Sequence, residues 1–132
     1  MKLSILLALD VAFSLVNAGC NLPFHASNPE YRAFIEVVQT KQAEGKFYSM
    51  HHRYGTFEEL GPREANLLAG HVVGGRYAGY IYRLDVSRGH YTLVAAPDAQ
   101  SSLRRSYFCD ETGILRQSFG PSFATAESPP IR

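Results

Sequence analysis

The chain has 132 residues, with 13 Lys and Arg against 12 Asp and Glu, and 45% of its residues are hydrophobic. This length supports one compact domain with a single core. The formal net charge of +1, without a run of like charges, argues against nucleic acid or anionic lipid as a partner chosen by charge. Tyr and Phe without Trp favour a strand-rich domain over a helical bundle.

The first 19 residues have the pattern of an export signal. A lysine follows the first Met, residues 3–16 form an apolar run, and the small pair Ala18-Gly19 precedes Cys20. The run is shorter than the ~20 apolar residues that a membrane-spanning helix needs, and Asp10 interrupts it. We expect residues 1–19 to be a signal peptide and the mature chain to be extracytoplasmic, in the periplasm, secreted, or anchored to the envelope.

Cys20 has alternative fates. The segment resembles a bacterial lipoprotein signal, in which the cysteine after a small residue is diacylated, although Asn17 departs from the aliphatic residue usual at its position. Plain secretion would instead permit a disulfide between Cys20 and Cys109, the second of the two cysteines. An uncleaved N-terminal helix ranks third. Lipidation of Cys20 ranks first, and residues 20–29 then form a tether.

A long helix is predicted to follow the tether. Ser27 is a candidate N-cap, Glu30 stands three residues later as in a capping box, and Pro29 is tolerated in the first turn. The apolar stripe comprises Tyr31, Phe34, Ile35 and Val38, and the polar side comprises Arg32, Glu36 and Lys41. The helix is expected to end near His52, and its apolar face to pack on a sheet.

Two short helical turns are predicted next. Thr56 can cap a turn that runs through Leu60, and residues 64–68 are the second candidate. The segment from Gly61 to Gly79 is glycine-rich and contains no phosphate-loop spacing. We therefore expect a variable loop there.

Beyond Gly79 the hydrophobic period changes from about 3.6 to 2, which indicates strands. The predicted strands are residues 80–86, 90–96, 105–109 and 114–117. A three-residue loop, Ser87-Arg88-Gly89, joins the first two, and Asp110-Glu111-Thr112-Gly113 is a tight turn before the last. The sequence thus predicts an α+β fold, with one N-terminal helix on a four-stranded antiparallel meander over residues 30–120. Residues 121–132 are expected to form an irregular tail on the surface or to fray.

Several short motifs point to one family. They are Ala43-Glu44, Phe47-Tyr48, Arg53-Tyr54-Gly55-Thr56 and Glu59-Leu60-Gly61 in the first half, and Gly79-Tyr80-Ile81-Tyr82, residues 91–97 and residues 105–116 in the second. Together, in this order, they resemble the head region of bacterial type IV pilin-like and type II secretion pseudopilin proteins. The prepilin processing site and the long apolar stalk helix of that family are missing, and the lipoprotein-like signal stands in their place.

The resemblance implies a structural or protein-interaction role in the cell envelope, with a secretion- or pilus-related protein as partner and the membrane reached through a lipid anchor. It also implies a calcium site, since major pseudopilins bind Ca²⁺ in a C-terminal loop; the candidate ligands are Asp110 and Glu111, with Asp98 or Asp85. The composition of Asp110 to Gly113 is also that of an ordinary hairpin turn, and we favour the turn over the calcium site.

Other chemistry has weaker support. The histidines His51, His52 and His90 with Cys109 are zinc-ligand types without zinc-site spacing. Cys109 on a strand beside Phe108 favours a buried role over a thiol nucleophile. The tyrosines at 77, 80, 82 and 91 suit a glycan surface or, by alternation, the core. We expect no enzyme and no cofactor beyond a Ca²⁺ candidate; a small glycan- or metal-binding module is the alternative, and an uncharacterised hydrolase ranks last.

Overall fold

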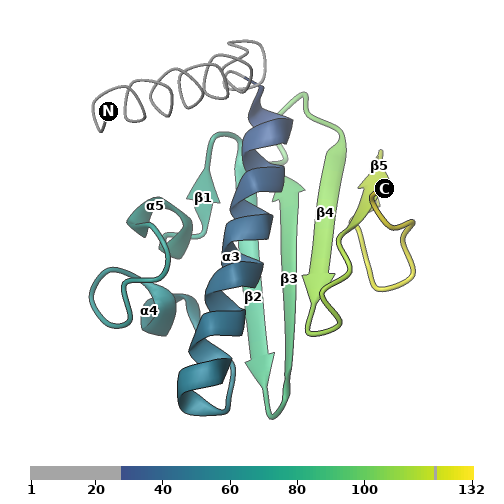
Figure 1. The fold of residues 1–132 in the computed structure, drawn as a ribbon. Coiled ribbons are helices and arrows are strands. Elements are labelled where there is room, and N and C mark those ends of the chain that lie inside the picture. Colours follow the sequence, from purple (N-terminus) through teal and green to yellow (C-terminus); the bar gives the residue numbers. More distant parts are fainter. Residues whose placement is uncertain (1–27, 121) are drawn as a thin grey trace, which may run out of the picture.

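The computed structural model describes residues 28–120 and 122–132. It is an α+β fold in which one long helix, α3 (Pro29–His51), lies across a five-stranded antiparallel sheet, as Figure 1 shows. The signal peptide, Cys20 and Ser27 lie outside the described residues. No helix among the described residues is both long and apolar enough to cross a bilayer.

Both ends of α3 have a local cause. Asn28 is the N-cap, and its side-chain oxygen accepts a hydrogen bond of 2.9 Å from the Glu30 N–H. Pro29 occupies the first helical position, where a missing N–H costs nothing. At the other end His52 adopts a left-handed conformation, with φ of 56°, and its N–H donates to the Tyr48 carbonyl. The predicted end near His52 is therefore confirmed.

The buried face of α3 is rotated from the predicted stripe. Its buried residues are Ala33, Glu36, Val37, Thr40, Ala43, Glu44 and Phe47. Tyr31 is exposed, Phe34 lies at the side of the contact, and Glu36, predicted for the polar side, is buried. Small residues at the centre of the face let the helix approach the sheet closely, which places the larger aromatic side chains at the margin. The predicted stripe was wrong in this respect.

Two one-turn helices follow. The helix α4 (Phe57–Leu60) begins with a capping box, in which the Thr56 and Glu59 side chains each accept from the other's backbone N–H, as predicted. Residues 64–68, predicted as a second turn of helix, form an irregular turn instead. The second short helix is α5 (Gly70–Val73), inside the predicted loop.

The sheet order follows the chain order. Its strands are β1 (Arg76–Tyr77), β2 (Tyr80–Ser87), β3 (His90–Pro97), β4 (Arg105–Asp110) and β5 (Arg116–Phe119), with every neighbouring pair antiparallel. The meander is confirmed, and the fifth strand is the two-residue β1. A strand of two residues carries no period-2 pattern, so the sequence offers no sign of it.

Two turns of the meander were predicted. Gly113 closes the turn after β4 with an N–H bond of 3.0 Å to the Asp110 carbonyl and a positive φ of 78°. Between β2 and β3, Ser87 pairs with His90, so the hairpin loop has two residues, Arg88 and Gly89, in place of the predicted three.

The C-terminal segment packs on the sheet. Its Ile131 N–H donates to the Leu115 carbonyl, Arg116 pairs with Pro130, and Ala124 is buried with its N–H on the Ser106 hydroxyl at 2.7 Å. Residues 122–132 are irregular, as expected, and lie on the surface. The Pro129 carbonyl accepts the Gln117 N–H. Both prolines are tolerated here because a residue at a sheet edge can lack an N–H.

The core lies between α3 and one face of the sheet. The inward side chains of the central strands are buried: Tyr80, Tyr82, Tyr91, Leu93, Ala95, Tyr107 and Cys109. The opposite face of β2 carries Arg83 and Asp85, which are exposed. Strand alternation therefore separates an inner face packed on α3 from an outer face.

Candidate functional site

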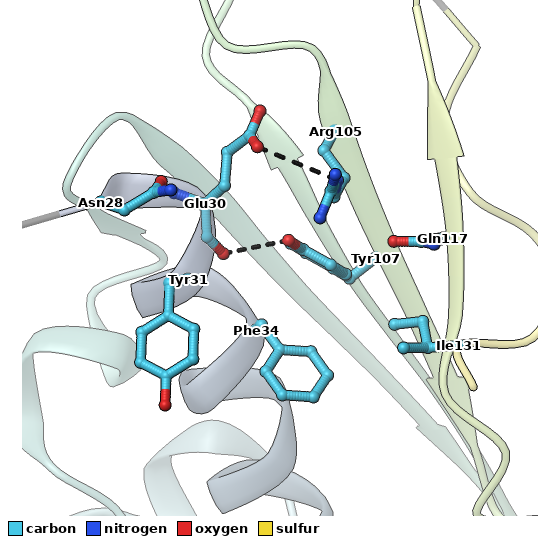
Figure 2. A pocket seen from close by; sticks show the side chains of 8 residues that line it. All are labelled: Asn28, Glu30, Tyr31, Phe34, Arg105, Tyr107, Gln117 and Ile131. Atoms are coloured by element: carbon cyan, nitrogen blue, oxygen red, sulfur yellow. Dashed lines mark hydrogen bonds and ion pairs between the residues drawn. The ribbon is translucent and has the colours of Figure 1, made fainter. Parts of the chain in front are cut away.

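A pocket opens where the first turn of α3 meets β4, β5 and the C-terminal segment. It has a volume of about 360 Å³ and is shown in Figure 2. The side chains that line it are Asn28, Glu30, Tyr31, Phe34, Arg105, Tyr107, Gln117 and Ile131. The α3 residues come from one wall and the strand residues from the other, so the site depends on three segments that are far apart in the sequence.

Arg105 and Glu30 form a long ion pair in this pocket. Arg105 Nε lies 3.9 Å from Glu30 Oε2, which is longer than a hydrogen bond. Arg105 Nε is buried and has no hydrogen-bond partner among the described residues, while the guanidinium lies 4.5 Å from the centre of the Phe119 ring. The Tyr107 hydroxyl donates to the Glu30 carbonyl at 3.0 Å and holds the helix start against β4. The pocket therefore contains hydrogen-bonding capacity that these contacts leave unused.

A second surface lies along β2. The strand β1 pairs only with Tyr80 and Ile81, and the Tyr82 N–H donates to the Gly75 carbonyl at 2.8 Å. Because N–H groups alternate in direction along an antiparallel strand, those of Leu84 and Val86 point to the same edge. Within the described residues, no backbone hydrogen bond across this edge reaches either of them. The second half of β2 is an open edge.

An apolar groove adjoins that edge on the outer face of the sheet. It has a volume of about 450 Å³. Its lining comes from β2, β3, β4 and the C-terminal segment: Ile81, Arg83, Asp85, Val94, Ala96, Pro97, Phe108, Phe123, Ala124 and Thr125. The Phe123 side chain is 63% exposed, and Arg83 Nε bonds Asp85 at 3.0 Å at the rim.

Glu44 forms a buried polar contact at the other end of α3. Its Oε2 accepts the Gly55 N–H at 2.8 Å, while its Oε1 has no hydrogen-bond partner within residues 28–120 and 122–132. Burial raises the pKa of Glu44 to about 7, although the Gly55 hydrogen bond opposes this shift. A Cβ at residue 55 would lie 3.1 Å from the Phe47 ring, so a larger residue there would require the ring to shift. The carboxyl ties the loop after α3 to the helix.

Glu36 and His71 form a second helix-to-loop contact. Glu36 Oε1 lies 2.8 Å from His71 Nε2, and the His71 ring packs on Tyr77 at 4.2 Å between centroids. The other Glu36 oxygen and the Tyr82 hydroxyl are buried without a hydrogen-bond partner. This pair fastens the α5 region to α3.

The structure separates the predicted calcium ligands. Asp110 and Glu111 lie near the start of β3, since Thr92 pairs with Asp110, whereas Asp98 follows the other end of that eight-residue strand. At about 3.3 Å per residue, the strand keeps the two ends roughly 20 Å apart. Asp85 pairs with Thr92 from the neighbouring strand and accepts from Arg83 Nε at 3.0 Å. The other carboxylates also have partners: Asp110 accepts the Thr112 N–H, Glu111 contacts His90 at 2.6 Å, and Asp98 contacts Arg76 at 3.0 Å. Within residues 28–120 and 122–132, no three His, Cys, Asp or Glu side chains form a metal-binding group.

The predicted zinc and thiol residues form no metal-binding group in the part of the chain that the structure describes. His51 and His52 lie at the end of α3, and His90 lies at the start of β3. Cys109 is a buried free thiol whose Sγ is 3.8 Å from the Tyr91 hydroxyl, and burial raises its pKa. The buried role predicted for Cys109 agrees with this position. Its proposed disulfide partner, Cys20, lies outside the described residues.

Sequence reasoning missed the pocket, the groove and the Glu44 contact. Tyr80, Tyr82 and Tyr91 are in the core, so they do not form the glycan surface that was the alternative for them. Glu44 had one usable sign, because it lies four residues after Thr40 and three before Phe47 on one helix face. Comparisons with models of protein families, with curated proteins and with solved structures find no match.

Proposed function

We propose that this chain is an exported domain with a non-catalytic, protein-interaction role in the bacterial cell envelope, anchored by a lipid on Cys20. Its head is pilin- or pseudopilin-like in this proposal, and the packing of one helix across an antiparallel meander supports that resemblance. The partner is an extended segment of an envelope protein, which adds a strand to the sheet.

The observation that carries this proposal is the open edge of β2. Leu84 and Val86 present backbone N–H and C=O groups that another strand can pair with. The side chains of Arg83 and Asp85 are both exposed on this strand. The matching segment should therefore carry an acidic residue opposite Arg83 and a basic residue opposite Asp85. The apolar groove beside them accepts an apolar side chain of the same segment.

Photocrosslinking in the producing cell tests the strand-addition step. A photoreactive residue at Arg83 should crosslink to one envelope protein. Val86→Pro removes an N–H that points to the edge and leaves the β2–β3 hydrogen bonds intact, so it should abolish the crosslink. Val86→Thr keeps the N–H and a β-branched side chain and should retain it. An undiminished crosslink in a folded Val86→Pro variant would refute the edge as the docking site.

The intact mass of the membrane-extracted protein tests the anchor separately. Diacylation at Cys20 after loss of residues 1–19 is expected, with Cys109 a free thiol. A product that starts at Met1 in the cytosolic fraction would contradict the exported role.

A further inference from the structure

The pocket at the start of α3 has the size and chemistry of a small-molecule site. Its volume of about 360 Å³ falls in the usual range of roughly 300–1,000 Å³. It combines aromatic walls with side chains that hydrogen-bond, and it lies apart from the β2 edge described above (Figure 2).

The polar groups of the pocket suit a hydroxyl group. The Arg105 side chain is 35% exposed and the Glu30 side chain 25% exposed, with Arg105 Nε 3.9 Å from Glu30 Oε2, so the guanidinium offers donors and the carboxylate an acceptor to a group in the pocket. A hydroxyl is both donor and acceptor, so one hydroxyl placed beside the pair can accept from Arg105 and donate to Glu30. The half-buried Gln117 side chain lines the pocket and adds a further donor and acceptor.

The walls suit a flat ring with apolar faces. Tyr31 is 41% exposed, its ring is 6.5 Å from Phe34, and Phe34 is 5.9 Å from Tyr107. The C–H face of a sugar packs on such aromatic surfaces while its hydroxyl rim stays free for polar side chains. In Figure 2 the Tyr31 and Phe34 rings project from α3, the Glu30 side chain points toward Arg105, and the Tyr107 ring lies beside Arg105 and Gln117.

Charge and polarity exclude two other ligand classes. An anion attracted by Arg105 would also meet the Glu30 carboxylate, which cancels most of the attraction. A purely apolar ligand would take Arg105 and Gln117 out of water without supplying hydrogen bonds, at a cost per polar group of about 1–3 kcal/mol.

We infer that this pocket binds one unit of a neutral saccharide, with the sugar face on Tyr31 and Phe34 and its hydroxyls on Arg105, Glu30 and Gln117. This inference does not depend on the proposed strand addition at β2, because the two surfaces share no lining residue. It gives the domain a second contact, with a glycan, at the N-terminal end of α3.

The test uses the whole mature chain and two-dimensional amide NMR. The probes are the methyl glycosides of glucose, galactose, mannose and N-acetylglucosamine, with methyl glucuronide as the charged comparison. At least one neutral glycoside should give saturable shifts at residues 28–34 and 105–107, and the glucuronide should bind more weakly. The inference is overturned if no neutral glycoside shifts these amides or if the glucuronide binds more tightly.

Matched variants locate the site. Tyr31→Ala should weaken binding about tenfold, whereas Tyr48→Ala should not, although Tyr48 is equally exposed on the same helix. Gln117→Leu should weaken saccharide binding to a similar extent. Gln42→Leu, on the exposed side of α3, is its control and should leave the binding unchanged. Equal losses of saccharide affinity in a variant and its control would refute the assignment of the site. Val86→Pro should leave saccharide binding intact. The strand-addition proposal and the saccharide proposal can therefore fail independently of each other.

Discussion

The two ends of α3 are held in different ways. At its C-terminal end the polar groups are engaged by nearby backbone: Glu44 bonds Gly55, and Thr56 and Glu59 cap α4. At its N-terminal end Glu30 and Arg105 face each other across 3.9 Å in an open pocket. The difference is that direct hydrogen bonds hold the loop at the C-terminal end, whereas the charged pair at the N-terminal end is too long for a hydrogen bond.

The largest expected effect compares two phenylalanines. Phe47→Ala should lower the free energy of unfolding by about 3–5 kcal/mol, because its ring is 97% buried beneath Gly55 and Arg53. Phe34→Ala at the pocket end should cost about half as much, since that side chain is only partly buried. Urea unfolding of both variants measures this. Equal losses of unfolding free energy in the two variants would contradict the difference between the two ends of α3.

The second effect depends on pH. The pKa of Glu44 is about 7 in the folded chain against an ordinary 4.5, so the folded state keeps its proton longer. The stability from this group is fully present below pH 4.5 and is lost as pH rises through 7, by at most about 3 kcal/mol. Glu44→Gln still accepts from Gly55 and should remove this pH dependence. Parallel stability curves for the two proteins between about pH 4 and 8 would contradict it.

The third effect concerns the capping box. Thr56→Ala removes the acceptor for the Glu59 N–H and should cost about 1 kcal/mol. Thr56→Ser keeps the hydroxyl and is the control. Chemical denaturation midpoints distinguish the two, and an unchanged midpoint in Thr56→Ala would mean that the cap does not fasten the loop.

The smallest effect is expected at the pocket. Glu30→Gln should change the free energy of unfolding by about 0.5 kcal/mol or less, because the Arg105 pair is long and partly exposed. The same unfolding assay reports it. A loss as large as that of Thr56→Ala would show that this end is fastened too.

The local features of the fold were predictable because each has a short-range cause. Thr56 with Glu59, and Asp110 with Gly113, mark a helix start and a turn within four residues. Strand alternation also placed Tyr80 and Tyr82 on one face, and both are buried.

The site was not predictable from local patterns. Its lining joins the α3 start to Arg105, Gln117 and Ile131, which the chain brings together only through the sheet and the C-terminal segment. The helix face was misjudged for a related reason. Hydrophobic spacing ranked Tyr31 above Ala33, while close packing on the sheet selects the smaller residue.

The order of the sheet has a consequence for how the chain folds. Every strand pairs with its neighbour in sequence, so each hairpin can close over a short loop at little entropic cost. The contacts between elements far apart in the sequence are those of α3 with β3 and β4. Folding should therefore be fast, with the β2–β3 hairpin as an early structure and the docking of the last residues as a late event.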